Sequence, residues 1–403
     1  MIDLTKITGI CAGAILLAMC GSCSGEKKLA TIGDMEVVTF DDMEVIGSRE
    51  GGLVVADLTS PGAMKAMLLS DLANDIELIK LDPSDEALVR SGNVWLSDKR
   101  FIIYDGNELK HFDRSGKYLG KIGSKGNGPG EYFIAPYEVT IDEAGGRIYV
   151  LAYAADKILT YDLDGKFTGN VPLARKAEKG FMEVNPDSTL TVASLTFTVN
   201  DDPYTVWRQD FQGNLIEGVK AGHLKVEPDY SNEIYKGVSD SGFTYSLFLL
   251  DAQADTLYDY AQGTLRPDFT ARFADKIPMH RYSSFPGFYM VYLAGEPEQV
   301  APGTYQLSVQ APVLIDRATL RGGRVALVLD VLGPIIADDE WIFGKNPEYF
   351  TLNLDPGDLE ESLRKALTEN TDLTDSDRER INGLLDTISP DDNNYLIIGK
   401  WKK

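Results

Sequence analysis

Few side chains in this sequence combine the residue types and the spacing that a catalytic or metal site requires. The strongest candidate for phosphate binding is the Gly-rich run Ser124–Tyr132 (SKGNGPGEY). This run lacks the G-K-[ST] ending of a phosphate-binding loop, and no helical pattern follows it to direct a dipole at a phosphate. We therefore predict that its glycines and proline let the chain cross from one strand to the next.

Metal-binding patterns are also incomplete. Asp113, Asp162 and Asp164 stand in D-x-x-G or D-G sequences, whereas a calcium loop needs alternating carboxylates and a later Glu. These sequences predict hairpin turns. None of the histidines has H-x-x-x-H or H-E-x-x-H spacing, and His111 lies in a predicted strand as a packing residue. The sequence contains three histidines: His111, His223 and His280.

Aromatic residues beside carboxylates are the more promising group. Such combinations suit the binding of sugars or peptides, although tyrosines that pack between sheets explain the same residues. A neutral or cationic ligand group is favoured by the local acidity. No G-x-S-x-G sequence is present, so nucleophilic hydrolysis has no support. The predicted ligand-facing residues are Glu131, Tyr132, Tyr153, Asp156, Asp201, Asp202 and Tyr204.

A repeated sequence motif indicates the strands and turns that position these residues. An aromatic residue, an acidic turn ending in Gly and an alternating strand recur from Phe112, Tyr161 and Asp210, with a weaker copy from Tyr258. The steps between the turn glycines are 49, 48 and 50 residues. A period near 50 with several short strands per unit is typical of a β-propeller. The turn glycines are Gly116, Gly165, Gly213 and Gly263.

We therefore predict an all-β fold, a six-bladed β-propeller over residues 70–403, with a short helical insertion at about residues 356–388. Residues 36–69 form a segment that packs on the propeller. The alternation around Ile76–Leu81, just ahead of the first full unit, predicts a strand that closes the ring by joining the last blade. In this geometry the crossings and the loops between second and third strands surround one mouth of a central channel.

The N-terminus has the features of an export signal. Residues 1–22 contain Lys6 and then an apolar run of 13 residues, Ile7–Met19, which is shorter than the roughly 20 residues that span a bilayer. Small residues precede Cys23, which we predict to be lipidated, with residues 23–35 as a tether. Lipidation at Cys20 and an ordinary cleaved signal peptide remain alternatives.

The charge excludes several kinds of partner. The formal net charge of −23 repels nucleic acid and anionic membranes, so the predicted membrane attachment is through the lipid alone. All three cysteines lie in the leader, which excludes a disulfide framework or a cysteine nucleophile in the folded part.

Four stretches of the sequence carry a resemblance to a known family: Ser70–Leu81, Phe112–Tyr132, Asp255–Phe273 and the terminal DDNNYLIIGKWKK. In these stretches the sequence resembles the TolB-like six-bladed β-propeller lipoproteins of Gram-negative gut-type bacteria. The resemblance covers most of residues 71–403. It implies a propeller in the cell envelope, anchored to the inner or outer membrane and facing the periplasm or the cell surface. It carries over no catalytic residues.

The sequence thus favours a lipid-anchored scaffold, more a binding protein than an enzyme, that uses one propeller face. Its predicted ligand or partner is a glycan, a peptide or an envelope protein. The alternative is a metal-dependent hydrolase or lyase, similar to propeller lactonases, with a divalent cation on the channel axis. A subunit of a larger envelope complex is a third possibility. No cofactor is predicted outside the metal alternative.

Overall fold

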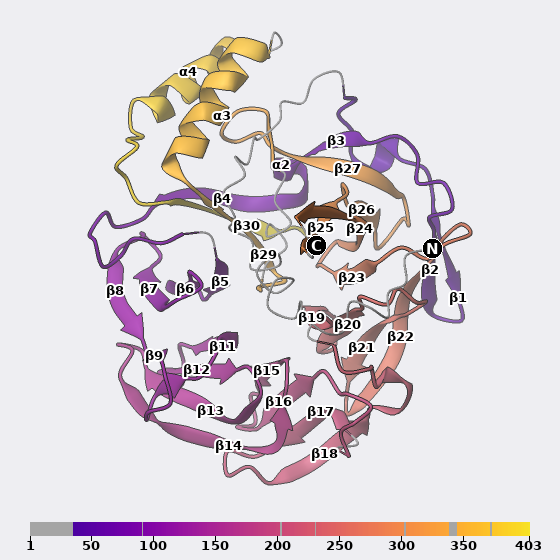
Figure 1. Cartoon of the computed structure of the whole chain (residues 1–403). Helices are drawn as coiled ribbons and strands as arrows, with labels where there is room; N and C mark the ends of the chain where they lie inside the picture. The colour runs from indigo at the N-terminus through magenta and orange to yellow at the C-terminus, as the bar shows by residue number, and fades with distance from the viewer. Residues whose placement is uncertain are drawn as a thin grey trace.

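A ring of β-sheets forms the body of the molecule (Figure 1). The computed structural model describes residues 35–90, 92–201, 204–229, 231–301, 304–337, 345–370 and 373–403. The predicted signal peptide, Cys23, all of the tether except its last residue and Asp202 lie outside these residues. The all-β, propeller-like arrangement agrees with the fold class expected from the 50-residue period.

Three successive sheets follow the repeat strand by strand. Each has four antiparallel strands in chain order, with the first strand at the inner side of the ring and the fourth at the outer side (Figure 1). The first sheet contains β5 (Asn93–Leu96), β6 (Arg100–Tyr104), β7 (Leu109–Asp113) and β8 (Tyr118–Ile122). The second contains β11 (Pro136–Asp142), β12 (Arg147–Ala152), β13 (Ala155–Asp162) and β14 (Phe167–Ala177). The third contains β15 (Gly180–Val184), β16 (Leu190–Ser194), β17 (Tyr204–Gln209) and β18 (Leu215–Lys220).

A thirteen-stranded sheet continues the ring. It begins with β19 (Glu233–Val238), β20 (Phe243–Phe248), β21 (Leu257–Ala261) and β22 (Thr264–Arg272). It continues with β23 (His280–Ser284), β24 (Phe288–Ala301), β25 (Thr304–Val309), β26 (Val313–Asp316), β27 (Gly322–Leu329) and β28 (Ile335–Ile336). The strands therefore do not fall into six separate hydrogen-bonded sheets.

The N-terminal segment adds strands to the outer edges of this large sheet. β2 pairs in parallel with β22, and β3 pairs in parallel with β27. Because these strands cover edges that would otherwise be open, the segment protects the sheet against pairing with other chains. The strands involved are β1 (Gly47–Glu50), β2 (Leu53–Asp57) and β3 (Lys65–Leu68).

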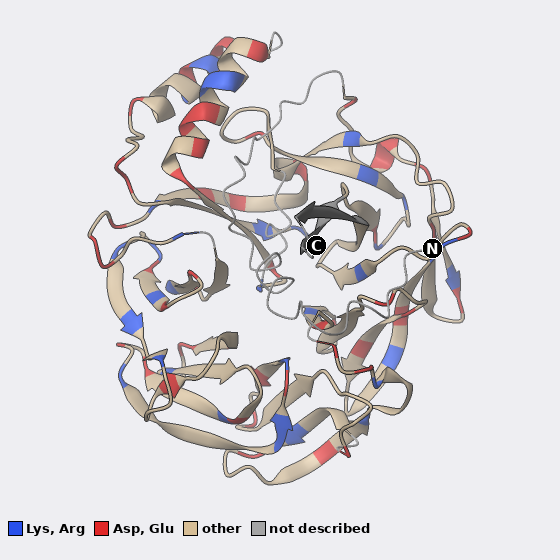
Figure 2. Cartoon of the chain, in the orientation of Figure 1, with Lys and Arg blue, Asp and Glu red and all other residues tan. Residues whose placement is uncertain are grey.

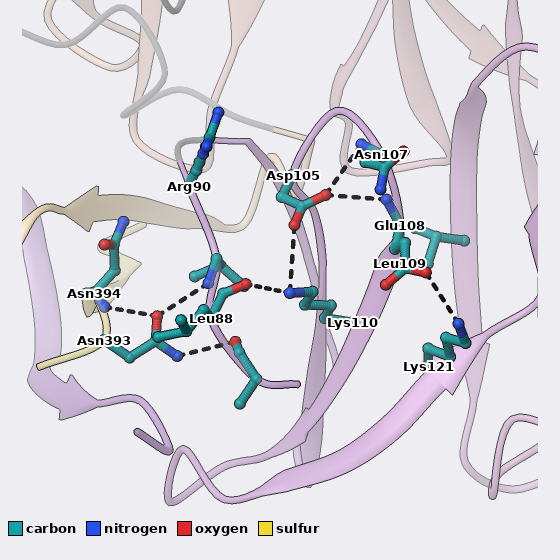
Figure 3. Close-up of polar contacts among 12 residues, drawn as sticks. Leu88, Arg90, Asp105, Asn107, Glu108, Leu109, Lys110, Lys121, Asn393 and Asn394 are labelled. Atoms are coloured by element: carbon teal, nitrogen blue, oxygen red, sulfur yellow. Dashed lines mark hydrogen bonds and ion pairs between the residues drawn. The ribbon is translucent and has the colours of Figure 1, made fainter. Parts of the chain in front are cut away.

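The ring closes as the sequence predicts. β4 (Ala73–Lys80) pairs antiparallel with β30 (Tyr395–Trp401), which pairs with β29 (Tyr349–Leu354). Asn393 connects the strands of this junction through its side-chain amide: Oδ1 accepts from Val89 N at 3.0 Å, and Nδ2 donates to the carbonyl of Ala87 at 2.9 Å (Figure 3). Nδ2 also donates to the carbonyl of Asp82 at 2.8 Å. Nearby, buried Lys110 donates to the carbonyl of Leu88 (Figure 3).

The repeated acidic turns join neighbouring sheets. Gly116, Gly165, Gly213 and Gly263 all have positive φ, between 73° and 89°. A Cβ on Gly165 would lie 2.7 Å from the carbonyl oxygen of Lys121 in the preceding outer strand, so any other residue would force the turn or that strand to shift. Within the turn, Asp162 Oδ1 accepts from the backbone N–H groups of Asp164 and Lys166. The prediction of hairpin turns is confirmed.

The predicted helical insertion is also present. α3 (Pro356–Glu369) begins at the N-cap Asp355, and α4 (Asp375–Leu385) begins at Thr374 with a capping box. Both helices lie at the outer side of the ring and carry charges of both signs (Figure 2). No helix among the described residues has the length and apolarity to cross a membrane. The remaining short elements are α2 (Leu69–Leu72), η2 (Phe40–Asp42), η3 (Gly222–Leu224), β9 (Ser124–Lys125) and β10 (Glu131–Tyr132).

The hydrophobic core is divided among the junctions between sheets. One cluster, for example, joins Trp95 and Ile102 of the first sheet to Val139 and Ile148 of the second. Each sheet thus packs on its two neighbours, as expected for a repeat architecture. His111 is buried as a packing residue, and burial together with the positive charge of Arg100 lowers its pKa to about 4.

Candidate functional site at the ring axis

Polar side chains from three different sheets meet at the inner side of the ring. Tyr137 lies near the start of β11, Lys179 directly precedes β15, and Glu233 begins β19. The hydroxyl of Tyr137 donates to the carboxylate oxygens of Glu233, at 3.0 and 3.2 Å, although the sheet β15–β18 lies between theirs. Such a contact is possible only where the inner strands converge on the ring axis (Figure 1).

Strand direction places this meeting point at one end of the ring. β12 runs antiparallel to β11, so the loop after β12 lies at the end where β11 begins. That loop carries Tyr153, whose ring lies 5.9 Å from the ring of Tyr137. The Asp–Gly turns follow β7, β13 and β17, and therefore lie at the opposite end. Tyr153 is thus a predicted ligand-facing residue that the structure brings to the axis.

An arginine extends the group around the axis. The guanidinium of Arg281 in β23 lies over the ring of Tyr235 at 4.1 Å and over the ring of Tyr292 at 5.0 Å. Tyr235 in turn lies close enough to Tyr137 to contribute to the raised pKa of Tyr137. We refer to Tyr137, Tyr153, Lys179, Glu233, Tyr235 and Arg281 together as the axial cluster.

The cluster contains an ion pair with a buried lysine and a largely buried phenol. The side chain of Lys179 is 1% exposed and forms an ion pair with Glu233, and its Nζ also donates to the carbonyl of Asn232 at 2.9 Å. Burial and the adjacent Glu233 raise the pKa of Tyr137 well above its usual range. Tyr137 therefore remains a neutral phenol and a hydrogen-bond donor.

A second polar group lies along the same inner strands. Lys236 in β19 forms an ion pair with Glu183 in β15, with 2.9 Å between Nζ and Oε1. Glu138 in β11 is buried, which raises its pKa to about 7 although Lys236 and Lys345 act to lower it. Burial alone would lower the pKa of Lys236, but the carboxylates of Glu183 and Glu138 outweigh it and raise that pKa.

These groups can position a polar ligand more readily than they can perform a reaction. The tyrosine rings offer flat apolar surfaces, and the hydroxyl, ammonium and guanidinium groups offer hydrogen bonds. Among the described residues, no group of three or more His, Cys, Asp or Glu side chains is arranged to hold a metal ion. His280, which lies beside Arg281, is held by Asp255 at 3.0 Å and by the carbonyl of Pro278 at 2.7 Å.

Glu131 and Tyr132 do not reach the axis as predicted. The carbonyl of Gly130 accepts from the hydroxyl of Tyr161 at 2.9 Å, which holds this crossing beside β13. Tyr132 is 1% exposed between two sheets, and its hydroxyl accepts from Leu109 N. The expectation that its side chain faces a ligand is therefore corrected. The carboxylate of Glu131 closes the crossing by accepting from Gly128 N at 2.7 Å.

The other predicted residues lie apart from the axial cluster. Tyr204 begins β17, where the guanidinium of Arg175 covers its ring at 4.7 Å. Asp156 and Asp201 are exposed at the end of the ring where the inner strands begin. Asp202 lies outside the described residues.

Sequence reasoning missed most of the axial cluster. The residue patterns in the sequence single out Tyr153 but not Tyr137, Lys179, Glu233, Tyr235 or Arg281. The available signal was polar and charged residues inside strands of otherwise apolar sheets, as in EIYKGV (Glu233–Val238). A buried charge is costly unless it is paired, so a charged residue in an inner strand points to a polar site.

The fold resembles that of solved bacterial proteins. A protein from Bacteroides fragilis NCTC 9343, described as exported, is 18% identical with a TM-score of 0.52, over 83% of this chain and 98% of that chain. A member of the DUF4221 family from Bacteroides vulgatus ATCC 8482 is 12% identical with a TM-score of 0.40, over 82% of this chain and 97% of that chain. The first likeness supports the propeller-like fold alone.

Comparison with curated proteins found no match. The family model described as "Domain of unknown function (DUF4934)" matches residues 53–291, which include the inner strands of the axial cluster, and the chain belongs to this family.

Proposed function

We propose that this protein is a binding scaffold of the cell envelope, which holds a polar ligand or a partner at the end of the ring that carries the axial cluster. The observation that carries this proposal is the convergence of Tyr137, Lys179 and Glu233 from three sheets. Buried and half-buried polar groups that are drawn together from distant parts of a chain are costly to keep, and a role in binding accounts for them.

A six-bladed ring is the architecture we propose for the scaffold. The thirteen-stranded sheet is joined between β20 and β23 by the single residue pair Phe248–Arg281. Division at this pair gives two units, β19–β22 and β23–β27, each extended at its outer edge by N-terminal strands. With the three regular sheets and the closing sheet β29–β30–β4, the count is six.

Attachment to the membrane is proposed to occur through acylated Cys23. The short apolar run that ends in small residues before Cys23 supports it, as does the exported character stated for the similar B. fragilis protein. Cys23→Ala should move the mature protein from the membrane fraction to the soluble fraction, whereas Cys20→Ala should not. If the Cys23→Ala protein stays membrane-bound, Cys23 is not the anchor.

The hydrolase or lyase alternative has less support. It requires carboxylate, amide or imidazole groups that converge on a metal ion, and the described residues offer no such group of His, Cys, Asp or Glu. The carboxylates at the axis are instead directed at lysines, as in the Glu233–Lys179 and Glu183–Lys236 pairs.

A thermal-shift screen tests the binding role. The mature protein is screened against neutral glycans, short peptides and divalent metal ions, because a ligand that binds only the folded state raises the unfolding midpoint. The shift should disappear in Tyr137→Phe/Tyr153→Ala and persist in Asp162→Ala, which alters an Asp–Gly turn at the opposite end. A shift that survives the axial double variant but is lost in Asp162→Ala would place the site at the wrong end.

A further inference from the structure

Arg281 is held in place by aromatic rings and has no acidic partner among the residues that the structure describes. Its guanidinium lies over the rings of Tyr235 and Tyr292, at 4.1 and 5.0 Å. Its buried Nε has no hydrogen-bond partner, and no carboxylate of the described residues forms an ion pair with it. The side chain is nevertheless half-buried rather than free in solvent. A fixed cation without a counterion among the described residues is unusual in a chain with a net charge of −23.

Two other cations stacked on tyrosines have polar partners. Lys80 lies over Tyr395 and forms an ion pair with Asp392 at 2.8 Å. Arg317 lies over Tyr289 and donates to Ser284 Oγ at 3.3 Å. Stacking on an aromatic ring thus does not by itself leave a cation unpaired in this protein, and Arg281 differs from these examples.

Three described carboxylates of the inner strands, Glu233, Glu183 and Glu138, do not compensate Arg281. Glu233 is neutralised by Lys179, and Glu183 is neutralised by Lys236. The carboxyl of Glu138 is buried with its pKa raised to about 7, which reduces its charge at neutral pH. The expectation that local acidity favours a neutral or cationic ligand therefore does not account for the position of Arg281.

We propose that Arg281 is an anion-recognition group, and that the ligand of the axial cluster carries a carboxylate. A guanidinium is planar and presents two parallel N–H groups to a carboxylate, and stacking on Tyr235 and Tyr292 fixes its plane before the ligand arrives. Preorganisation of this kind reduces the entropy lost on binding. The tyrosine rings of Tyr137 and Tyr153 then contact the uncharged part of the same molecule.

This inference rests on the proposed binding role of the axial cluster and specifies its ligand class. Two matched pairs of small molecules test it by isothermal titration calorimetry on the mature protein. Glucuronate is compared with glucuronamide, and N-acetylglycine with N-acetylglycinamide, since each pair differs only in the carboxylate. The first pair represents a sugar acid and the second the acidic end of a peptide.

Arg281→Gln and Arg281→Lys are the test variants, and Arg324→Gln is the matched control. Arg324 also has a buried Nε without a hydrogen-bond partner, but it lies in β27, separated from β23 by β24 and β26. Removal of a charged hydrogen-bond partner should weaken binding of the carboxylate roughly 10- to 100-fold in Arg281→Gln. Arg281→Lys keeps the charge without the planar fork, so it should recover only part of the affinity. It also tests the role of Arg281 if the glutamine variant does not fold.

The proposal is supported if a carboxylate binds and its amide does not, and if this binding is lost in Arg281→Gln and retained in Arg324→Gln. The pair that binds shows whether the ligand is a sugar acid or the acidic end of a peptide. Four results would overturn the proposal: equal binding of acid and amide, equal effects of the two Gln variants, full affinity in Arg281→Gln, or no binding of either carboxylate. If neutral ligands bind through Tyr137 and Tyr153 while neither carboxylate binds, the binding role stands and the carboxylate class is wrong.

Discussion

The two ends of the ring use their charged residues in different ways. At the end with the Asp–Gly turns, the first aspartate of each regular turn accepts from N–H groups of its own turn, as Asp113 Oδ1 does from Ser115 and Lys117. Glu143 is an exception at this end, because it accepts from Ser97 and Arg100 of the neighbouring sheet. At the end with the axial cluster, the partners come from different sheets, as in the Tyr137–Glu233 contact across an intervening sheet. The hydrogen bonds inside the Asp–Gly turns recur from one sheet to the next, whereas the Tyr137–Glu233 contact between sheets does not recur. The difference suggests that the turn end provides architecture and the axial end provides recognition.

The largest effect should come from the most deeply buried charge of the axial cluster. Lys179→Met removes the ammonium and leaves Glu233 without its cation, which should lower the free energy of unfolding by about 3 to 5 kcal/mol. Chemical denaturation measures this change. The double variant Lys179→Met/Glu233→Gln should lose less than the single variant. A single variant as stable as the native protein would remove the distinction between the two ends.

The ring junction provides a polar residue with a purely structural role for comparison. Asn393→Ala would leave the N–H of Val89 and the carbonyls of Asp82 and Ala87 without their side-chain partner. The expected loss is about 3 kcal/mol in the free energy of unfolding, without a change in ligand affinity. Asn107→Ala, in an exposed loop, is the control and should change stability by less than about 0.5 kcal/mol. Altered ligand affinity in Asn393→Ala would show that the junction also serves recognition.

A pH dependence should distinguish the axis from the rest of the ring. The pKa of Glu138 is about 7 in the folded protein against an ordinary value of 4.5. The folded state therefore holds the proton more tightly, and this contribution to stability is present below pH 4.5 and is lost as the pH rises through 7. Glu138→Gln has no such loss, so its stability relative to the native protein should rise with pH by up to about 3 kcal/mol.

Glu143 provides a control with the opposite sign. Burial acts to raise its pKa, but hydrogen bonds from Ser97 and Arg100 outweigh burial and lower it. Its contribution to stability is therefore present above pH 4.5 and is lost as the pH falls below that value. Denaturation curves from about pH 3 to pH 8 should show opposite trends, with the change in Glu143→Gln below pH 4.5 and the change in Glu138→Gln between pH 4.5 and 7. Parallel trends would contradict the assignment of Glu138.

The sequence predicts the parts of this molecule that depend on neighbouring residues in the chain. Gly116 and Gly165 mark a turn within a few residues, and the alternation of Ile76–Leu81 marks the closing strand, so both predictions are confirmed. The helical insertion expected at about residues 356–388 is found as α3 and α4. The axial cluster depends on pairs such as Tyr137 with Glu233, whose separation of 96 residues has no local signal. Tyr132 was misplaced because residue type alone does not distinguish a tyrosine at a surface from one between sheets.

The smallest expected effect tests the structural role of the repeated turns. Gly165→Ala places a Cβ at φ +82°, 2.7 Å from the carbonyl oxygen of Lys121, and should cost about 2 kcal/mol because strain and a clash with the preceding sheet add together. Gly146→Ala is the matched control, since Gly146 has φ +65° in a hairpin turn but no heavy atom within 4 Å of its Cβ position. It should cost about 1 kcal/mol from strain alone. Both variants should keep native ligand affinity, because the turn at Gly165 lies at the opposite end from the axial cluster and Gly146 lies outside that cluster. Equal costs would mean that the repeated turn shapes its own hairpin without joining the sheets, and a loss of affinity in Gly165→Ala would show that the two ends are coupled.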